Sequence, residues 1–181
     1  AAAYADMRRH NVAPLVASDW LIEQVKDAAR DDIAAAMTTE MGAPTDMSRE
    51  DQAGSGSFHI ETFIDTFKDF EFIRPLGDHA PTSMVAWEPV GVVAAITPWN
   101  WPMNQVTLKV IPAILAGNTV VLKPSEIAPL SSMVFAEVVD EAGLPKGVFN
   151  LVNGDGRAMS EVALADEDLA GIHFTGSTAT F

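Results

Sequence analysis

From residue 83 onward, short apolar runs of strand character alternate with longer segments of helical periodicity, and this alternation constrains the fold more than any other feature. Strands and helices that alternate in this way form a parallel sheet with right-handed crossover connections. We therefore expect an α/β fold in which helices flank a parallel sheet. The strands are predicted at 90–96, 118–122, 148–152 and 171–174, and the helices at 103–116, 130–142 and 156–165.

The chain before residue 83 is predicted to be helical, so we divide the sequence into a helical N-terminal segment, 1–82, and a sheet-forming part, 83–181. One helix is predicted over 12–41, because its apolar residues recur at helical spacing. A second is predicted over 45–72, with a bend at Gly54-Ser55-Gly56. Its aromatic residues are assigned to the core: Phe58, Phe63, Phe67 and Phe70.

The composition disfavours several classes of partner. The 181 residues carry a formal net charge of −14, which disfavours nucleic acid and anionic membrane surfaces. The sequence has no apolar run long enough to cross a membrane, and residues 1–9 lack the pattern of a signal peptide, so a cytoplasmic location is expected. No metal site is expected, because cysteine is absent and the histidines are scattered: His10, His59, His79 and His173.

A stiff turn follows the strand predicted over 90–96. The segment Thr97-Pro98-Trp99-Asn100-Trp101-Pro102 places one amide side chain between two tryptophans and two prolines. Ligands of open α/β sheets bind outside the carboxyl ends of the strands. Asn100 is therefore a candidate for a fixed hydrogen-bond donor to a ligand, and the alternative is an asparagine that only shapes the turn.

The residues after the next strand suit a nucleotide. Lys123 closes the strand predicted over 118–122, and Glu126 follows three residues later. A carboxylate at a strand end can accept hydrogen bonds from ribose hydroxyls. A lysine there can neutralise a phosphate or donate to the ribose. The alternative is a surface lysine and glutamate with no ligand.

Two glycine-containing turns are further candidates. Thr175-Gly176-Ser177 ends the last strand and is expected to open a helix, whose N–H groups and dipole attract pyrophosphate. A common turn is the alternative. The segment 153–159 lacks the usual dinucleotide fingerprint, because Met159 occupies the third glycine position. Gly156 is expected to line the cofactor groove or to form a plain turn.

Taken together, four segments resemble the aldehyde dehydrogenase superfamily. They are 97–102, 116–126, 143–150 and 174–177, and they occur in the order found in that family without an insertion between them. The resemblance over residues 1–82 is looser. It implies an incomplete aldehyde dehydrogenase fold, in which a Rossmann-like sheet follows the helical segment.

The resemblance also implies a cofactor, NAD with NADP as a possibility, an aldehyde substrate for the complete enzyme, and a homo-oligomer. Asn100 matches the donor to the oxyanion that forms when a thiolate attacks an aldehyde. Lys109 lies at the spacing of a lysine near the proton-relay path of the family, with a solvated helix lysine as the alternative. The implied cofactor contacts are Thr97, Pro98, Trp99, Lys123, Ser125, Glu126, Gly156, Thr175, Gly176 and Ser177.

The resemblance does not extend to the centre of the chemistry. The nucleophilic cysteine and general-base glutamate of the family lie beyond the segment matched by 174–177, and this sequence contains no cysteine. We therefore expect an amino-terminal part of an aldehyde dehydrogenase that lacks the catalytic domain and is inactive alone. Two alternatives are a non-catalytic dinucleotide-binding module and an interaction fragment that needs a second polypeptide. Binding of NAD by the isolated chain separates the first from the second.

Overall fold

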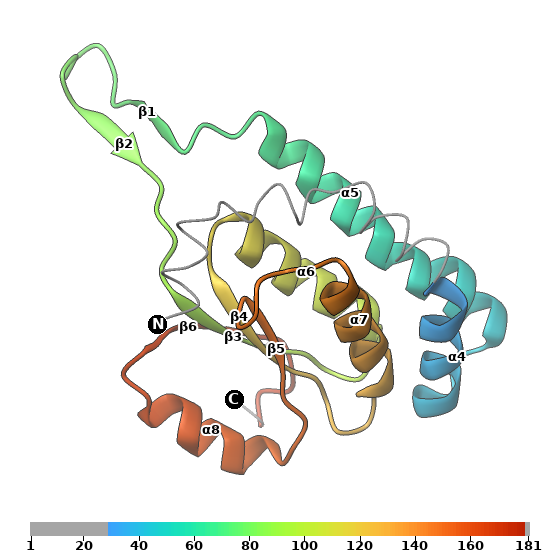
Figure 1. The fold of residues 1–181 in the computed structure, drawn as a ribbon. Helices are drawn as coiled ribbons and strands as arrows, with labels where there is room; N and C mark the ends of the chain where they lie inside the picture. The colour runs from blue at the N-terminus through green and yellow to red at the C-terminus, as the bar shows by residue number, and fades with distance from the viewer. Residues whose placement is uncertain (1–28, 180–181) are drawn as a thin grey trace.

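The computed structural model describes residues 29–179, which form a parallel sheet with helices on both faces (Figure 1). The part of the helix expected over 12–41 that precedes residue 29 lies outside the described residues. In chain order the elements are α4 (Arg30–Met41), the π-helix η2 (Met47–Ala53), α5 (Gly54–Lys68), β1 (Ile73–Pro75), β2 (Met84–Ala86), β3 (Val92–Ile96), α6 (Pro102–Leu115), β4 (Thr119–Lys123), α7 (Leu130–Glu141), β5 (Phe149–Leu151), α8 (Gly156–Ala165) and β6 (Leu169–Phe174).

The main sheet confirms the predicted α/β fold. Its strands are all parallel and stand in the order β5-β4-β3-β6. Within this sheet the chain first forms β3, then β4 beside it, and then β5 at the edge. It next crosses back and forms β6 on the other side of β3. The direction of strand addition therefore reverses beside β3, between β4 and β6. Such a switch point is where open α/β sheets bind ligands.

Crossover helices cover both faces of this sheet: α6 and α7 lie on one face and α8 on the other (Figure 1). Right-handed crossovers that travel in opposite directions across a sheet place their helices on opposite faces. The core lies under α6 and α7, whereas α8 has no buried residue. The sheet, α6 and α7 contribute these buried residues: Ala95, Val120, Leu122, Met103, Val106, Val110, Ile111, Ile114 and Phe135.

The helices before the sheet pack onto α6 and α7 as an outer layer (Figure 1). α5 lies along α6, and α4 packs against α7. Their apolar residues join the same buried cluster, with Ile33 and Met37 from α4 and Ile60 and Ile64 from α5. The helical segment and the sheet therefore share one core, and the division of the chain at residue 83 stays a prediction.

The structure refines the helix expected over 45–72. It begins with a π-helix and changes to an α-helix at Gly54, which is where the bend was predicted. The α-helix ends at Lys68, and the following residues form β1, which pairs antiparallel with β2. The resulting hairpin projects from the body of the protein (Figure 1).

The assignment of aromatic residues to the core is wrong for two of the four. Phe58 is 62% exposed and Phe70 is 40% exposed. Phe58 is out of phase with the buried positions of α5, and Phe70 lies beyond the end of this helix. Phe63 and Phe67 are partly buried against the core, as the sequence predicts.

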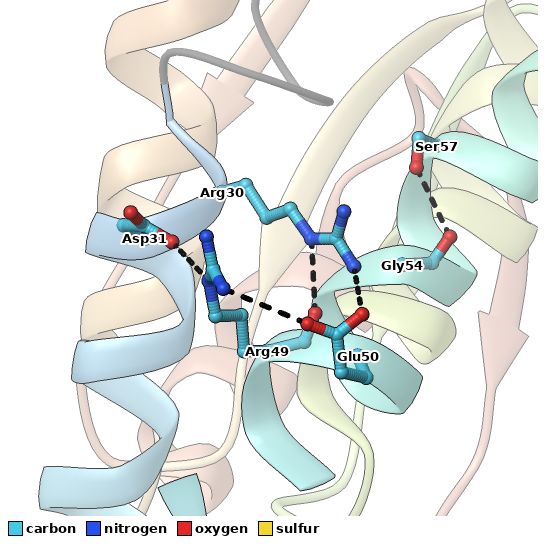
Figure 2. A network of polar contacts seen from close by, with 6 residues as sticks. All are labelled: Arg30, Asp31, Arg49, Glu50, Gly54 and Ser57. Carbon is cyan, nitrogen blue, oxygen red and sulfur yellow. Dashed lines mark hydrogen bonds and ion pairs between the residues drawn. The ribbon is translucent and has the colours of Figure 1, made fainter. Parts of the chain in front are cut away.

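Ion pairs join the start of α4 to η2 (Figure 2). Arg49 Nε lies 2.7 Å from Asp31 Oδ1, and Arg30 Nη2 lies 3.1 Å from Glu50 Oε2. The Nε–H of Arg30 also donates to the backbone carbonyl of Arg49 at 3.0 Å. These side chains remain accessible to water, so each pair contributes at most about 1 kcal/mol. The network therefore adds little stability, and its main effect is on the relative orientation of α4 and η2.

Candidate functional site

The turns that follow the four parallel strands meet at one edge of the sheet. Backbone hydrogen bonds between neighbouring strands fix their alignment there. These bonds run from the N–H of Thr97 to the carbonyl of Lys123 at 3.2 Å, from Val152 to Leu122 at 2.9 Å, and from Thr175 to Ile96 at 3.1 Å. The structure therefore brings the predicted turn residues to the carboxyl edge, beside the switch point of the sheet.

Lys123, Glu126 and Gly156 form a cluster at this edge. Lys123 Nζ lies 2.5 Å from Glu126 Oε1. The lysine side chain is 11% exposed, whereas the glutamate side chain is 53% exposed. A Cβ atom at Gly156 would lie 3.4 Å from Glu126 Oε1 and 3.6 Å from Lys123 Nζ. The glycine therefore leaves both charged groups open to an approaching ligand.

The electrostatics keep this carboxylate ionised. The hydrogen bond from Lys123 is the largest cause that lowers the pKa of Glu126, and the charge of Lys123 acts in the same direction. An ionised carboxylate accepts hydrogen bonds only, which suits hydroxyl donors. Ser125 shapes the turn between the two residues, since its hydroxyl accepts from the N–H of Ile127 at 3.3 Å.

Asn100 lies in an exposed turn that is fixed at both ends. Thr97 before it is only 3% exposed, and Pro102 after it opens α6. Trp101 between them has φ 53° and ψ 56°, a left-handed conformation that bulky residues rarely adopt. Trp99 is 47% exposed. The amide therefore stands near the N-terminus of α6, where backbone N–H groups and the helix dipole favour negative charge.

Lys109 is not a solvated helix lysine, because the residue is only 3% exposed. Its Nζ donates to Gln105 Oε1 at 3.2 Å, and no carboxylate pairs with it among the residues described. Burial lowers its pKa. The pKa of His173 on β6 is lowered by burial and then by the charge of Lys109. The charge of Lys109 on α6 is therefore felt at His173, which is an exposed residue of β6.

Thr175, Gly176 and Ser177 follow β6 at the same edge, but the helix expected after them is not seen within residues 29–179. A turn at 178–179 follows instead. A Cβ atom at Gly176 would lie 2.5 Å from Phe174 Cζ, so a larger residue here would have to displace the end of the Phe174 ring. The pyrophosphate role of this turn stays a prediction.

The start of α8 shows why the segment 153–159 is not a phosphate loop. Asp155 caps this helix, with Oδ1 accepting from the N–H of Ala158 at 2.9 Å. A carboxylate at that position occupies a donor and repels a phosphate. Gly156 itself lies beside Lys123 and Glu126, and its place in a cofactor groove stays a prediction.

Two long-range contacts near the site had no local signal in the sequence. Glu40 of α4 accepts hydrogen bonds from the N–H groups of Leu130 and Ser131 and so caps α7. His59 of α5 lies 2.8 Å from Asn104 of α6, measured from Nε2 to Nδ2. Within residues 29–179, no group of three or more His, Cys, Asp and Glu could hold a metal ion. No helix in that range has the length and apolar character needed to cross a membrane.

A doubly wound sheet with polar turns at its carboxyl edge defines a ligand-binding α/β protein of the nucleotide-binding type. The sequence matches the model of the aldehyde dehydrogenase family over residues 21–181. The chain therefore belongs to the aldehyde dehydrogenase family.

Similar proteins support this membership. The chain is 48% identical to a 3-succinoylsemialdehyde-pyridine dehydrogenase of a Pseudomonas species, over 87% of this chain and 33% of that protein. It is similar to an aldehyde dehydrogenase structure from Bartonella henselae, with 50% identity, a TM-score of 0.87, and coverage of 94% and 35% of the two chains. The structure of a mutant of aldehyde dehydrogenase C from Pseudomonas syringae was solved with NAD+ and octanal. It is 39% identical to this chain with a TM-score of 0.90, and the match covers 99% of this chain and 36% of that one. The chain thus spans about a third of the length of these relatives.

Proposed function

We propose that this chain supplies the adenosine-binding region and the oxyanion turn of an NAD(P)-dependent aldehyde dehydrogenase. The observation that carries the proposal is the cluster of Lys123, Glu126 and Gly156 at the carboxyl edge of the sheet. Supporting evidence comes from the Pseudomonas syringae relative, which was solved with NAD+ and octanal. The overall reaction converts an aldehyde, water and NAD+ into a carboxylate, NADH and two protons.

The residues present fit the adenosine half of a dinucleotide. Glu126 accepts from ribose hydroxyls, Lys123 orients this carboxylate, and the bare backbone at Gly156 admits the ligand. Glu126 also repels a 2′-phosphate, so NAD is preferred over NADP. The nicotinamide end supplies hydride acceptance when the cofactor is bound. Thr97, Pro98, Trp99 and the segment 175–177 line the same edge.

Asn100 donates its amide N–H to the substrate oxygen as negative charge develops on it. The positive end of α6 acts on the same oxygen. Lys109, whose pKa is lowered by burial, is a buried basic group that can hold or release a proton near this turn. The thiolate that attacks the aldehyde cannot come from these 181 residues, since they contain no cysteine.

This absence of cysteine favours a second role for the isolated chain, that of a dinucleotide-binding module without turnover. The aldehyde substrate, the homo-oligomeric state and the cytoplasmic location belong to the proposal for the whole enzyme. An interaction fragment is the competing class, and it predicts no cofactor binding at all.

Isothermal titration calorimetry of the chain with NAD+ and with NADP+ tests the proposal. NAD+ should bind, and Glu126→Gln should weaken its binding by roughly 10- to 150-fold, because a hydrogen bond to a charged group is worth about 1.5–3 kcal/mol. Glu161→Gln is a matched control, since this residue is exposed on α8 and pairs only with Arg157. No binding, or equal loss in both variants, would contradict the assigned ribose site.

A further inference from the structure

The first turn of α6 has no cap of its own. Its N-cap residue, Trp101, is in a strained left-handed conformation and makes no side-chain hydrogen bond to the helix. The free N–H groups at a helix start normally receive a side-chain oxygen from the N-cap residue. Buried Thr97 and Pro102 at the first helical position restrain the two ends of the turn, but no side-chain cap holds the free N–H groups between them.

Contacts from α5 hold this turn in place. A Cβ atom at Gly56 would lie 2.5 Å from Met103 Cγ, which shows how closely the two helices approach there. Met103 is fully buried. One turn further along α5, His59 Nε2 lies 2.8 Å from Asn104 Nδ2. Gly56 and His59 thus contact adjacent residues in the first turn of α6, directly after Asn100.

The two nitrogen atoms in the histidine contact show which group donates and which accepts. The amide nitrogen of Asn104 donates, so His59 Nε2 accepts and its proton lies on Nδ1. A protonated ring has no acceptor, so it must separate from the amide or force the amide to turn over. Separation removes this hydrogen bond from the first turn of α6, and a turned amide exchanges the positions of Oδ1 and Nδ2 there.

The surroundings favour the neutral ring. Burial lowers the pKa of His59, and Phe58 makes an edge contact with the ring at a centroid distance of 5.6 Å. No charged group contributes to this shift. The charged residues on α5, on α6 and on η2, the elements packed together here, are Glu61, Asp65, Lys68, Lys109, Arg49, Glu50 and Asp51.

We propose that His59 is a positioning residue for Asn100: its neutral ring accepts the amide of Asn104, fixes the first turn of α6, and so fixes the turn that presents the oxyanion donor. The inference rests on the proposed function of Asn100. According to this inference, α5 controls the chemical step although it carries none of the reacting groups named above. That control also depends on the protonation of one imidazole.

The chain itself allows a first test by NMR and hydrogen exchange. Nitrogen shifts of His59 should show a neutral ring with the proton on Nδ1. His59→Leu should speed amide exchange over 103–107 by about five- to tenfold, the effect expected for one neutral hydrogen bond. His59→Gln should restore slow exchange, because its Oε1 can accept from Asn104. His79→Gln, which changes a histidine of the β1–β2 hairpin, is the control. Exchange that is equal in all variants would overturn the proposal.

The full-length enzyme gives the second test. His59→Leu should lower kcat about five- to tenfold at every pH and leave KM for NAD+ unchanged. His59→Gln should retain kcat near neutral pH but lose the decline on the acid side that the unsubstituted enzyme shows when His59 is protonated. A purely structural role would not produce this separation between kcat, KM and the pH profile.

The variant Asn100→Ala separates failure of this inference from failure of the proposed function. If Asn100→Ala lowers kcat whereas His59→Leu and His59→Gln behave like the unsubstituted enzyme at all pH values, the positioning role is wrong and the oxyanion role stands. If Asn100→Ala leaves kcat unchanged, the oxyanion role is wrong and the inference about His59 falls with it.

Discussion

The close approach of α5 to α6 makes a specific prediction for two glycines that stand two residues apart. Gly54 and Gly56 both lie in the first turn of α5. A Cβ atom at Gly54 would have Arg30 Nη2 as its nearest neighbour at 3.8 Å, which is ordinary contact. The corresponding atom at Gly56 would lie 2.5 Å from Met103 Cγ and 3.3 Å from its Sδ. The same substitution by alanine should therefore have opposite effects.

The magnitudes follow from two opposing terms. Replacing a helical glycine by alanine stabilises by roughly 0.5–1 kcal/mol, because the unfolded chain loses freedom. Gly54→Ala should gain this amount. Gly56→Ala gains it too but inserts a methyl group into a filled site, which costs about 1–3 kcal/mol. Met103 is fully buried and cannot move into solvent. We expect Gly56→Ala to be less stable than Gly54→Ala by about 1–3 kcal/mol.

Urea unfolding followed by far-ultraviolet circular dichroism measures this difference, and the two variants serve as controls for each other. An unchanged slope in urea would show that the denatured state is the same in both. Equal free energies of unfolding for the two variants would refute the reasoning. That result would mean that α5 and α6 separate at little cost, and the positioning of Asn100 by α5 would lose its support.

Further predictions concern the site and its supports. Asn100→Ala should lower kcat of the complete enzyme by roughly 10²–10³ with little change in NAD affinity, as steady-state kinetics would show. Glu126→Gln should reduce the preference for NAD over NADP, measured as the ratio of the two kcat/KM values; an unchanged ratio would separate Glu126 from the ribose. Burial lowers the pKa of Lys109 from 10.5, so the unfolded state binds more protons between the two pKa values and stability rises with pH in that window. Lys109→Met should flatten this rise and stabilise the protein at pH 7, because it removes the cost of burying the charged group, as urea unfolding across pH would show. Glu40→Ala should cost about 1 kcal/mol because α7 loses its cap, with Glu40→Gln intermediate in the same unfolding assay.

The main sheet and its crossover helices could be predicted because their signals are local. Each strand is an apolar run, and each helix shows apolar residues at helical spacing. The helix predicted over 156–165 has the same bounds in the structure, Gly156–Ala165. The order of the strands, β5-β4-β3-β6, was not predicted, because crossover handedness fixes the face on which a helix lies but not the direction in which the next strand is added.

The features that escaped prediction depend on contacts between distant segments. The exposed position of Phe58 could not be read from its residue type, because which face of α5 is buried depends on how this helix lies on α6. The π-helical geometry of 47–53 has no sequence signature. A short strand was expected over 83–88, where β2 lies, but β1 and its pairing with β2 escaped prediction, because three residues are too few for a periodic pattern.

The candidate site divides in the same way. The predicted turns meet at one edge because parallel strands end together, so their convergence was foreseeable. The Lys123–Glu126 pair is also local, because its two residues are only three positions apart in sequence. The burial of Lys109 was not foreseeable, since a lone lysine on a helix is usually solvated.

The two halves of the site are consequently held by different forces. The cluster of Lys123, Glu126 and Gly156, which is the proposed ribose site, depends on a short-range ion pair after β4 and on the bare backbone at Gly156, so it should tolerate changes elsewhere in the fold. The turn of Asn100 instead includes a strained Trp101 and an uncapped helix start, and it keeps its position through contacts with α5. Substitutions in α5 that leave the sheet intact should therefore affect the chemical step and spare cofactor binding. Substitutions at Glu126 should do the reverse.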